Sequence, residues 1–172
     1  DDIARLNETA NDLGVDSIEL GATIAVLMEA GEGAFGDLQF MQACLEEIRS
    51  GSEKGRFYAS GTARVGAVMK VARVPVIKKQ AISAYDPRVV EVTGISMMLT
   101  AQGADHTVGN APSFKCDDKS IAELVTESLR MQINSAVADS FGLCVFGRSV
   151  TDDNLKLIAD AINDAFDAGI DP

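Results

Sequence analysis

Apolar residues recur every three or four positions through most of this chain, and glycine or proline ends each run. That spacing places apolar side chains on one face of an α-helix, and glycine commonly follows a helix end. Strands and helices do not alternate at the spacing of a βαβ unit. We therefore predict a mainly α, multi-helical fold, with helices at residues 1–13, 17–30, 38–50, 62–72, 87–99, 118–141 and 154–168.

Several helix boundaries follow from capping residues. In the sequence DSIE, Asp16 can accept the first backbone N–H groups of a helix, and Glu19 can reach back to complete a capping box. The fifth helix is expected to begin at Pro87, which suits a first turn, and the sixth at one of the aspartates in residues 117–118. The segment VPVIKKQAISAYDPR at residues 74–88 is expected to be extended, because Pro75 and Pro87 disfavour a helical conformation in the residues before them and valine and isoleucine are frequent.

The composition describes an acidic, globular chain. Its 172 residues suit one domain or pieces of two, and 47% hydrophobic content is enough to bury a core. The net charge is −11, and the main basic cluster is KVARVPVIKK at residues 70–79, which argues against nucleic acid as a partner. Apolar runs are too short to span a bilayer, and no signal peptide opens the sequence, so we expect a cytoplasmic protein without a membrane partner.

Three cysteines, Cys44, Cys116 and Cys144, form no C-x-x-C pair. An odd number argues against a secreted disulfide framework. Cys44 lies on an apolar stripe and is expected in the core, whereas Cys116 is expected in a loop. The first residue is not Met and lies within an expected helix, so we interpret the chain as a piece of a longer protein.

Two helix ends carry similar sequences, NDLGVD at residues 11–16 and DSFGLC at residues 139–144. A glycine alone would stop a helix, so the aspartate and cysteine of the second segment are surplus to that need. Carbonyl groups at a helix end accept hydrogen bonds, as does an adjacent carboxylate. Two such turns facing a cavity would suit a ligand rich in N–H donors, such as a pterin. Helix stops of this form are also ordinary, which keeps a purely structural interpretation open.

Several stretches, in the same order, resemble the tungsten-containing aldehyde ferredoxin oxidoreductase family. They are NDLGVDSI, CLEEIRSGSEKGRFYASGTARVG, AYDPR at residues 84–88, GADH at residues 103–106 and DSFGLC, and they cover most of residues 7–146. In that family, tungsten held by two pterin dithiolenes and a [4Fe–4S] cluster share one site, where aldehydes are oxidised to acids with electrons passed to ferredoxin. The resemblance implies the family's C-terminal helical domains, tungstopterin and [4Fe–4S] as cofactors, and ferredoxin and a small aldehyde as partners.

The resemblance also implies roles for particular residues. Cys144 would be the last thiolate ligand of the cluster, and His106, the only histidine, would lie near the metal and transfer a proton. Val108 stands where the family often has a basic residue that helps to hold the cofactor. Asn11 replaces the usual aspartate and keeps an acceptor oxygen without the charge, and Val15 replaces leucine. The implied pterin contacts are Asn11, Gly14, Val15, Asp16, Asp139, Gly142 and Leu143.

The same resemblance predicts a division of the chain. Residues 1–78 would be part of the middle helical domain with the first pterin motif, and residues 79–172 part of the C-terminal helical domain with the second motif and the cluster cysteine. Three further cluster cysteines, which precede the first motif in the family, are not in this chain. One thiolate cannot hold a four-iron cluster, so the isolated chain is expected to be inactive.

A second interpretation is a cofactor-free helical remnant that acts as a structural or partner-binding domain. The changes at Asn11 and Val108 favour it. Neither interpretation identifies the aldehyde, separates tungsten from molybdenum, or decides between a monomer and a homodimer.

Overall fold

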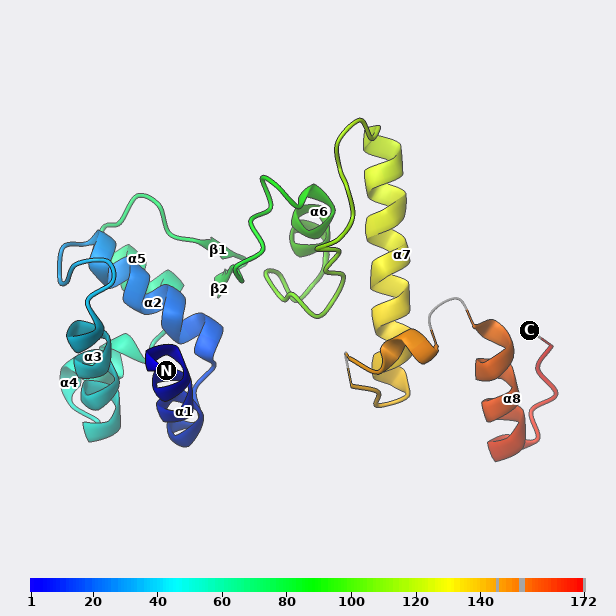
Figure 1. Ribbon diagram of the computed structural model, residues 1–172, viewed down its shortest axis with the longest axis horizontal. Coiled ribbons are helices and arrows are strands. Elements are labelled where there is room, and N and C mark those ends of the chain that lie inside the picture. Colours follow the sequence, from blue (N-terminus) through cyan, green and yellow to red (C-terminus); the bar gives the residue numbers. More distant parts are fainter. Residues whose placement is uncertain (145, 152–153, 172) are drawn as a thin grey trace. The chain divides into compact units, whose positions relative to one another are not determined.

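The computed structural model describes residues 1–144, 146–151 and 154–171, and it confirms the mainly helical fold (Figure 1). Its elements form two compact units, which are described separately: residues 1–84 with 101–105 make up the first unit, and residues 85–100 with 106–172 the second. None of the described helices has the length and continuous hydrophobicity that crossing a bilayer requires.

The first unit contains five helices and a small hairpin among its described residues. These are α1 (Asp2–Leu13), α2 (Ser17–Glu29), α3 (Leu38–Ser50), α4 (Glu53–Tyr58) and α5 (Thr62–Val68), with β1 (Val76–Ile77) and β2 (Gln80–Ala81).

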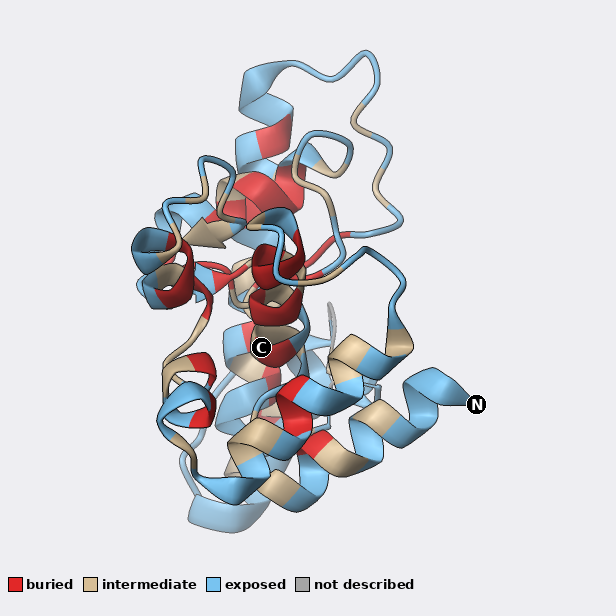
Figure 2. Cartoon of the chain, turned by 90° about the vertical axis from the view of Figure 1, so that its left-hand side faces the viewer, coloured by how far each residue is buried: buried red, intermediate tan, exposed pale blue. Residues whose placement is uncertain are grey.

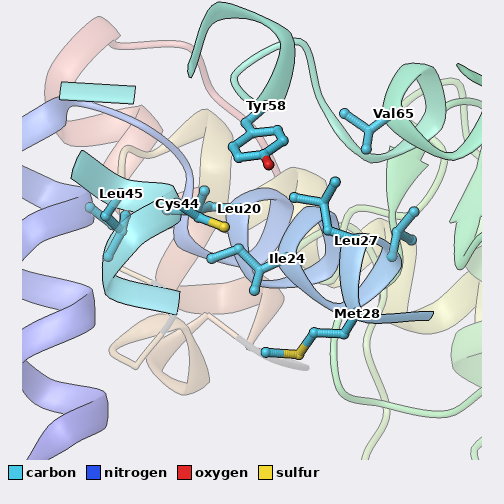
Figure 3. Packing of buried hydrophobic residues seen from close by; sticks show 10 residues of the cluster. Leu20, Ile24, Leu27, Met28, Cys44, Leu45, Tyr58 and Val65 are labelled. Atoms are coloured by element: carbon cyan, nitrogen blue, oxygen red, sulfur yellow. The ribbon is translucent and has the colours of Figure 1, made fainter. Parts of the chain in front are cut away.

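The core of the first unit surrounds α2, which packs against α5, while α3 packs against α4. Buried side chains of these helices meet there, among them Leu27, Val65 and Cys44 (Figure 3). Cys44 is 2% exposed, as predicted for a core residue, and burial raises the pKa of its thiol to about 11. By contrast, α1 buries only Ala10 and is exposed along most of its length (Figure 2). The apolar face predicted for this helix is therefore only partly buried, and Ile3 is 77% exposed.

Glu19 departs from its predicted role. Asp16 caps α2 as predicted, because its Oδ1 accepts the Glu19 N–H at 2.7 Å. The Glu19 carboxylate, expected to reach back to Asp16, instead accepts the Thr62 N–H at 2.7 Å and the Ala81 N–H at 2.9 Å. It therefore joins α2 to the start of α5 and to β2. The Thr62 hydroxyl adds a bond to the Glu19 carbonyl at 3.0 Å.

Helix α4 lies between the helices predicted at residues 38–50 and 62–72, where the glycines of residues 51–61 indicated only a connection. Ser52 begins it, with its hydroxyl accepting the Gly55 N–H at 2.8 Å. Gly55 is where α4 approaches α3, since a Cβ there would lie 1.8 Å from the Glu47 carbonyl oxygen. The glycine that indicated a loop thus permits close packing of two helices.

The segment expected to be extended forms an antiparallel hairpin, in which Val76 pairs with Ala81 and Ile77 with Gln80. Two residues make the turn, Lys78 and Lys79, with φ of 51° and 72°. Two-residue hairpin turns in which both central residues have positive φ match the twist of the strands, and they usually contain Asn or Gly. Here lysines occupy both positions.

The described part of the second unit contains α6 (Glu91–Leu99), α7 (Ile121–Ser140), a 3-10 turn at Arg148–Val150, and α8 (Leu155–Phe166). Its small core consists of Val92, Ala111 and Leu124 with partly buried neighbours. Asn154 caps α8 by accepting the Leu157 N–H at 3.2 Å, so α8 begins where the last helix was predicted to begin. Asp152 and Asp153, just before this cap, lie outside the described residues.

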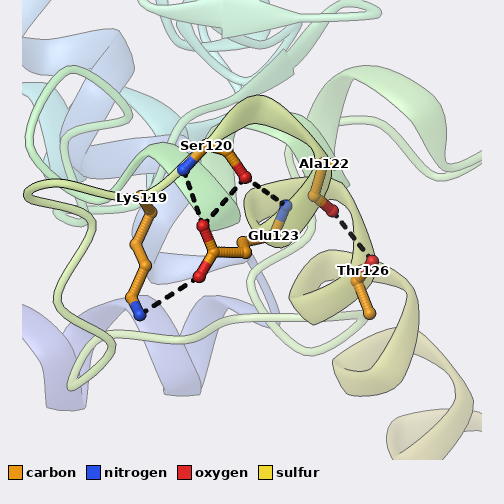
Figure 4. A network of polar contacts seen from close by, with 5 residues as sticks. All are labelled: Lys119, Ser120, Ala122, Glu123 and Thr126. Carbon is orange, nitrogen blue, oxygen red and sulfur yellow. Dashed lines mark hydrogen bonds and ion pairs between the residues drawn. The ribbon is translucent and has the colours of Figure 1, made fainter.

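Two predicted helix starts in this unit are wrong. Pro87 does not open α6, because residues 86–90 form a turn in which the Asp86 carbonyl accepts the N–H groups of Val89 and Val90. Neither aspartate at residues 117–118 opens α7. Ser120 does so, with a capping box in which the Glu123 carboxylate accepts the Ser120 N–H at 2.9 Å (Figure 4).

The apolar side chains of α7 are only partly buried. Leu124 is 7% exposed and lies in the core, whereas Leu129 and Ile133 are 56% and 53% exposed. The other buried positions of α7 carry small side chains, and its contact with α6 includes a hydrogen bond of 2.8 Å between the Ser96 and Ser128 hydroxyls. Hydroxyls that bond to each other stay hydrogen-bonded when they are buried, so a buried helix face can carry serines. The spacing of apolar residues therefore did not reveal these positions.

Candidate cofactor-binding turns

The first candidate turn closes α1. Gly14 has φ 68° and ψ 31°, and its N–H donates to the Asn11 carbonyl at 3.0 Å. The Val15 N–H donates to the Ala10 carbonyl at 3.1 Å. This pair of bonds around a left-handed glycine is a Schellman motif, which fixes the direction of the chain as it leaves the helix.

The second candidate turn, at the end of α7, has the same backbone arrangement. Gly142 has φ 67°, its N–H donates to the Asp139 carbonyl at 3.0 Å, and the Leu143 N–H donates to the Ala138 carbonyl at 3.0 Å. The likeness between the two sequences therefore extends to their hydrogen bonds. The two turns belong to different units of the chain.

Sequence reasoning missed one residue that both turns share. An alanine precedes Asn11 and Asp139, and these alanines, Ala10 and Ala138, are 2% and 1% exposed. In each turn, this alanine carbonyl accepts the N–H of the residue five positions further along the chain. The repeated pattern is thus alanine, an amide or carboxylate, two variable residues, glycine, a branched apolar residue and a polar one. Comparing one position further upstream in the two segments would have shown it.

Both turns leave room for a ligand beside the glycine. A Cβ built on Gly14 or Gly142 would meet no other group within 4 Å. The side chains of Asn11 and Asp139 are exposed, so their oxygens are available as acceptors. In the first unit, Val15 also lines a small cavity of about 170 Å³. Exposed oxygens of this kind can accept hydrogen bonds from a ligand with N–H donors. The pterin contacts stay a prediction.

Asp16 already has a structural partner, because its carboxylate caps α2. The cap accounts for an aspartate at this position without any ligand. Asp16 lines the same cavity as Val15, and its side chain is exposed. Its second oxygen can accept a further bond.

Cys144 follows the second turn, and its side chain is exposed. The other two cysteines have different surroundings: Cys44 is in the core of the first unit, and the Cys116 thiol lies 3.8 Å from the Phe114 carbonyl. Within the described ranges, no three His, Cys, Asp or Glu side chains gather as a metal site. The described residues therefore fit one ligand of a [4Fe–4S] cluster and not the complete set.

His106 lies in the second unit and is half-buried, with its ring stacked on Tyr85 at 6.3 Å between centroids and 24° between planes. Tyr85 belongs to the AYDPR segment, so the structure joins two of the stretches that carried the resemblance. Asp86 follows Tyr85 in the sequence, and hydrogen bonds from Arg88 lower the pKa of its carboxyl group to about 2. Sequence analysis did not single out Tyr85, although it lies within one of those stretches.

The loop that carries His106 is attached to α6. The Thr93 hydroxyl donates to the Asn110 side-chain oxygen at 2.9 Å and accepts the Ala111 N–H at 3.0 Å. All three residues are buried. Val108, where the resemblance expects a basic residue, is partly buried. These bonds anchor the end of the loop at residues 110–111, and His106 itself is partly covered.

Comparison with known proteins identifies the family. The family described as "Aldehyde ferredoxin oxidoreductase, domains 2 & 3" matches residues 1–172. Similar proteins include the tungsten-containing aldehyde ferredoxin oxidoreductases of Pyrococcus horikoshii, 28% identical, Pyrococcus abyssi, 27% identical, and Pyrococcus furiosus, 25% identical. Each comparison covers 84% of this chain and 28% of the relative, so the chain spans little more than a quarter of their length. The chain belongs to the aldehyde ferredoxin oxidoreductase family and matches its domains 2 and 3.

Proposed function

We propose that this chain is a portion of a tungstopterin iron–sulfur oxidoreductase that oxidises aldehydes to carboxylic acids, with ferredoxin as electron acceptor, in the cytoplasm. The observation that carries the proposal is the repeated Schellman turn at residues 10–16 and 138–144, which presents the same backbone groups beside an open glycine. Membership of the family supports it, as do relatives named as tungsten-containing enzymes.

The turns would hold the pterins through their exposed acceptors. At the first turn, the Asn11 amide oxygen, Gly14, Val15 and Asp16 would contact one pterin. At the second turn, Asp139, Gly142 and Leu143 would contact the other. When bound, tungstopterin and the cluster supply the electron transfer. Asp139 carries a full charge and accepts stronger hydrogen bonds than Asn11, so the second turn would bind its pterin more tightly.

His106 is proposed to exchange a proton with the substrate. Its stacking on Tyr85 limits rotation of the imidazole, which favours one orientation for proton transfer. Tyr85 would thus act as a positioning residue. We further propose the domain division at residues 78 and 79, with one pterin turn in each part.

The isolated chain is proposed to be inactive. A [4Fe–4S] cluster takes four thiolate ligands, and the described residues offer only Cys144 in an exposed position beside a candidate turn. The remaining ligands would come from outside these residues.

A second candidate is a cofactor-free helical domain with a structural or partner-binding role. The observation that favours it is that Asp16 and both glycines already serve as helix caps and stops. The two candidates differ in metal content.

A pair of cysteine variants in the full-length parent tests the proposal. Cys144→Ser is expected to remove most of the iron and the visible absorption of the purified protein, because a serine hydroxyl is a poor ligand for iron–sulfur clusters. The matched control is Cys116→Ser, whose thiol lies 3.8 Å from a backbone carbonyl and is expected to keep the iron of the wild type. If the two variants contain equal amounts of iron, Cys144 is not a ligand of the cluster.

A further inference from the structure

Charge is unevenly distributed along the chain. Residues 54–85 contain seven of the 15 basic residues and none of the 26 acidic ones. In the first unit this segment forms most of α4, α5 and the β1–β2 hairpin. The protein as a whole has a net charge of −11 and repels anions, but a basic region on it can attract them locally.

Two of these cations line the same cleft. Arg64 on α5 and Lys79 on the hairpin turn border an open cleft of about 680 Å³, together with Glu19, Ser60 and three alanines, Ala59, Ala63 and Ala67. Both cations are exposed, and neither side chain has an ion pair or hydrogen bond within the described part of the chain. Arg73 in the same segment differs, because it pairs with Glu29 at 2.5 Å.

The position of Lys79 is fixed at a steric cost. Its φ of 72° lies in the left-handed region, which side chains with a Cβ rarely adopt. The turn is held in place by the bond of 2.9 Å from the Ala81 N–H to Glu19. Gly103 packs behind it, since a Cβ there would lie 2.8 Å from the Ile77 carbonyl oxygen. Residues kept in such conformations by their surroundings frequently serve function.

Glu19 is the one acidic side chain among those that line this cleft in the described structure. Both of its oxygens are already engaged, one by the Thr62 N–H at 2.7 Å and the other by the Ala81 N–H. Its charge is therefore partly compensated by backbone dipoles, which leaves Arg64 and Lys79 free to attract an anion.

We propose that this cleft binds an organic carboxylate, with the carboxylate held by Arg64 and Lys79 and the carbon chain on the alanine methyl groups. A guanidinium matches a carboxylate with two parallel hydrogen bonds, and a lysine adds a second positive charge. The alanine lining favours a ligand with an apolar part over an inorganic anion. The proposal does not rest on the oxidoreductase function, because binding requires no cofactor.

Calorimetric titration of the 172-residue chain tests the cleft with two probes of equal length, hexanoate and the uncharged hexanamide. Hexanoate is expected to bind and hexanamide to bind at least about fivefold more weakly. Arg64→Gln and Lys79→Gln are each expected to weaken hexanoate binding about three- to fivefold, which is the usual effect of one exposed charge. The double variant should lose more than either single one.

Lys70→Gln is the matched control, since Lys70 is also exposed and has φ 56° but does not line the cleft. It should bind hexanoate like the wild type. Lys79→Gly provides a second variant that relieves the left-handed strain, so it should fold at least as well while binding more weakly. The proposal is overturned if folded wild-type chain fails to bind hexanoate, if hexanamide or inorganic phosphate binds equally well, or if Lys70→Gln weakens binding as much as Lys79→Gln.

Discussion

At the scale of single residues, Glu19 has the largest structural role that local sequence did not reveal. Its spacing from Asp16 matches a capping box, and the capping half formed by Asp16 is present. The carboxylate of Glu19 instead bonds to residues 62 and 81, more than 40 positions away along the chain. Only the tertiary fold brings those N–H groups within reach, so no local pattern could have predicted them.

Replacing Glu19 with glutamine tests this role. The amide keeps one acceptor oxygen and loses the other, so either the Thr62 or the Ala81 N–H loses its partner. Such a loss typically costs about 1–3 kcal/mol. We expect the free energy of unfolding, measured by urea denaturation, to fall by about that amount.

Glu8→Gln is the control for this prediction, because Glu8 is exposed on α1 and has no partner among the described residues. Its stability should match that of the wild type within about 0.5 kcal/mol, as is usual for surface substitutions. If both variants unfold at the same urea concentration, Glu19 does not join the three elements in solution.

At the scale of elements, the sequence predicted helices well where apolar spacing and glycine stops agreed. The ends of α1 and α3 at Gly14 and Gly51 are as expected, and both glycines have positive φ. Prediction failed for α4 because Gly55 serves close packing instead of a loop. It also failed for part of the buried face of α7, where hydrogen-bonded serines replace apolar residues.

The start of α7 was missed although its signal is in the sequence. Ser120 and Glu123 have the spacing of a capping box, but the aspartates before them suggested an earlier start. Asp118 has φ 61°, which is incompatible with the first turn of a right-handed helix. Two competing caps within a few residues cannot be ranked without the backbone conformation.

Ser120→Ala tests this cap. The substitution removes the acceptor of the Glu123 N–H and one donor to its carboxylate, and loss of a serine cap commonly costs about 1 kcal/mol. We expect lower stability in urea and less helical circular dichroism at intermediate denaturant. Ser140→Ala at the other end of α7 is the control, since the Ser140 hydroxyl donates only to a carbonyl of its own helix. Equal stability of the two variants would contradict the role of the cap.

At the scale of the whole molecule, the family could be inferred from short stretches in a fixed order, and family comparison over residues 1–172 confirms it. The resemblance supplied the site residues, and the structure adds the identical hydrogen bonds of the two turns and the stacking of Tyr85 on His106. Those details depend on backbone angles and on contacts between segments, which residue types alone do not specify. The roles of the site residues stay predictions.

The central claim is that the two turns together hold one tungstopterin, with one pterin at each turn. The most direct test is the metal and pterin content of the native protein that contains this sequence. The protein should be purified without oxygen from its source cells, and tungsten, iron and released pterin should be measured against protein concentration. We predict tungsten and pterin in proportion to the chain, together with iron. Protein purified in this way that contains neither tungsten nor molybdenum and releases no pterin would contradict the account and favour a cofactor-free helical domain.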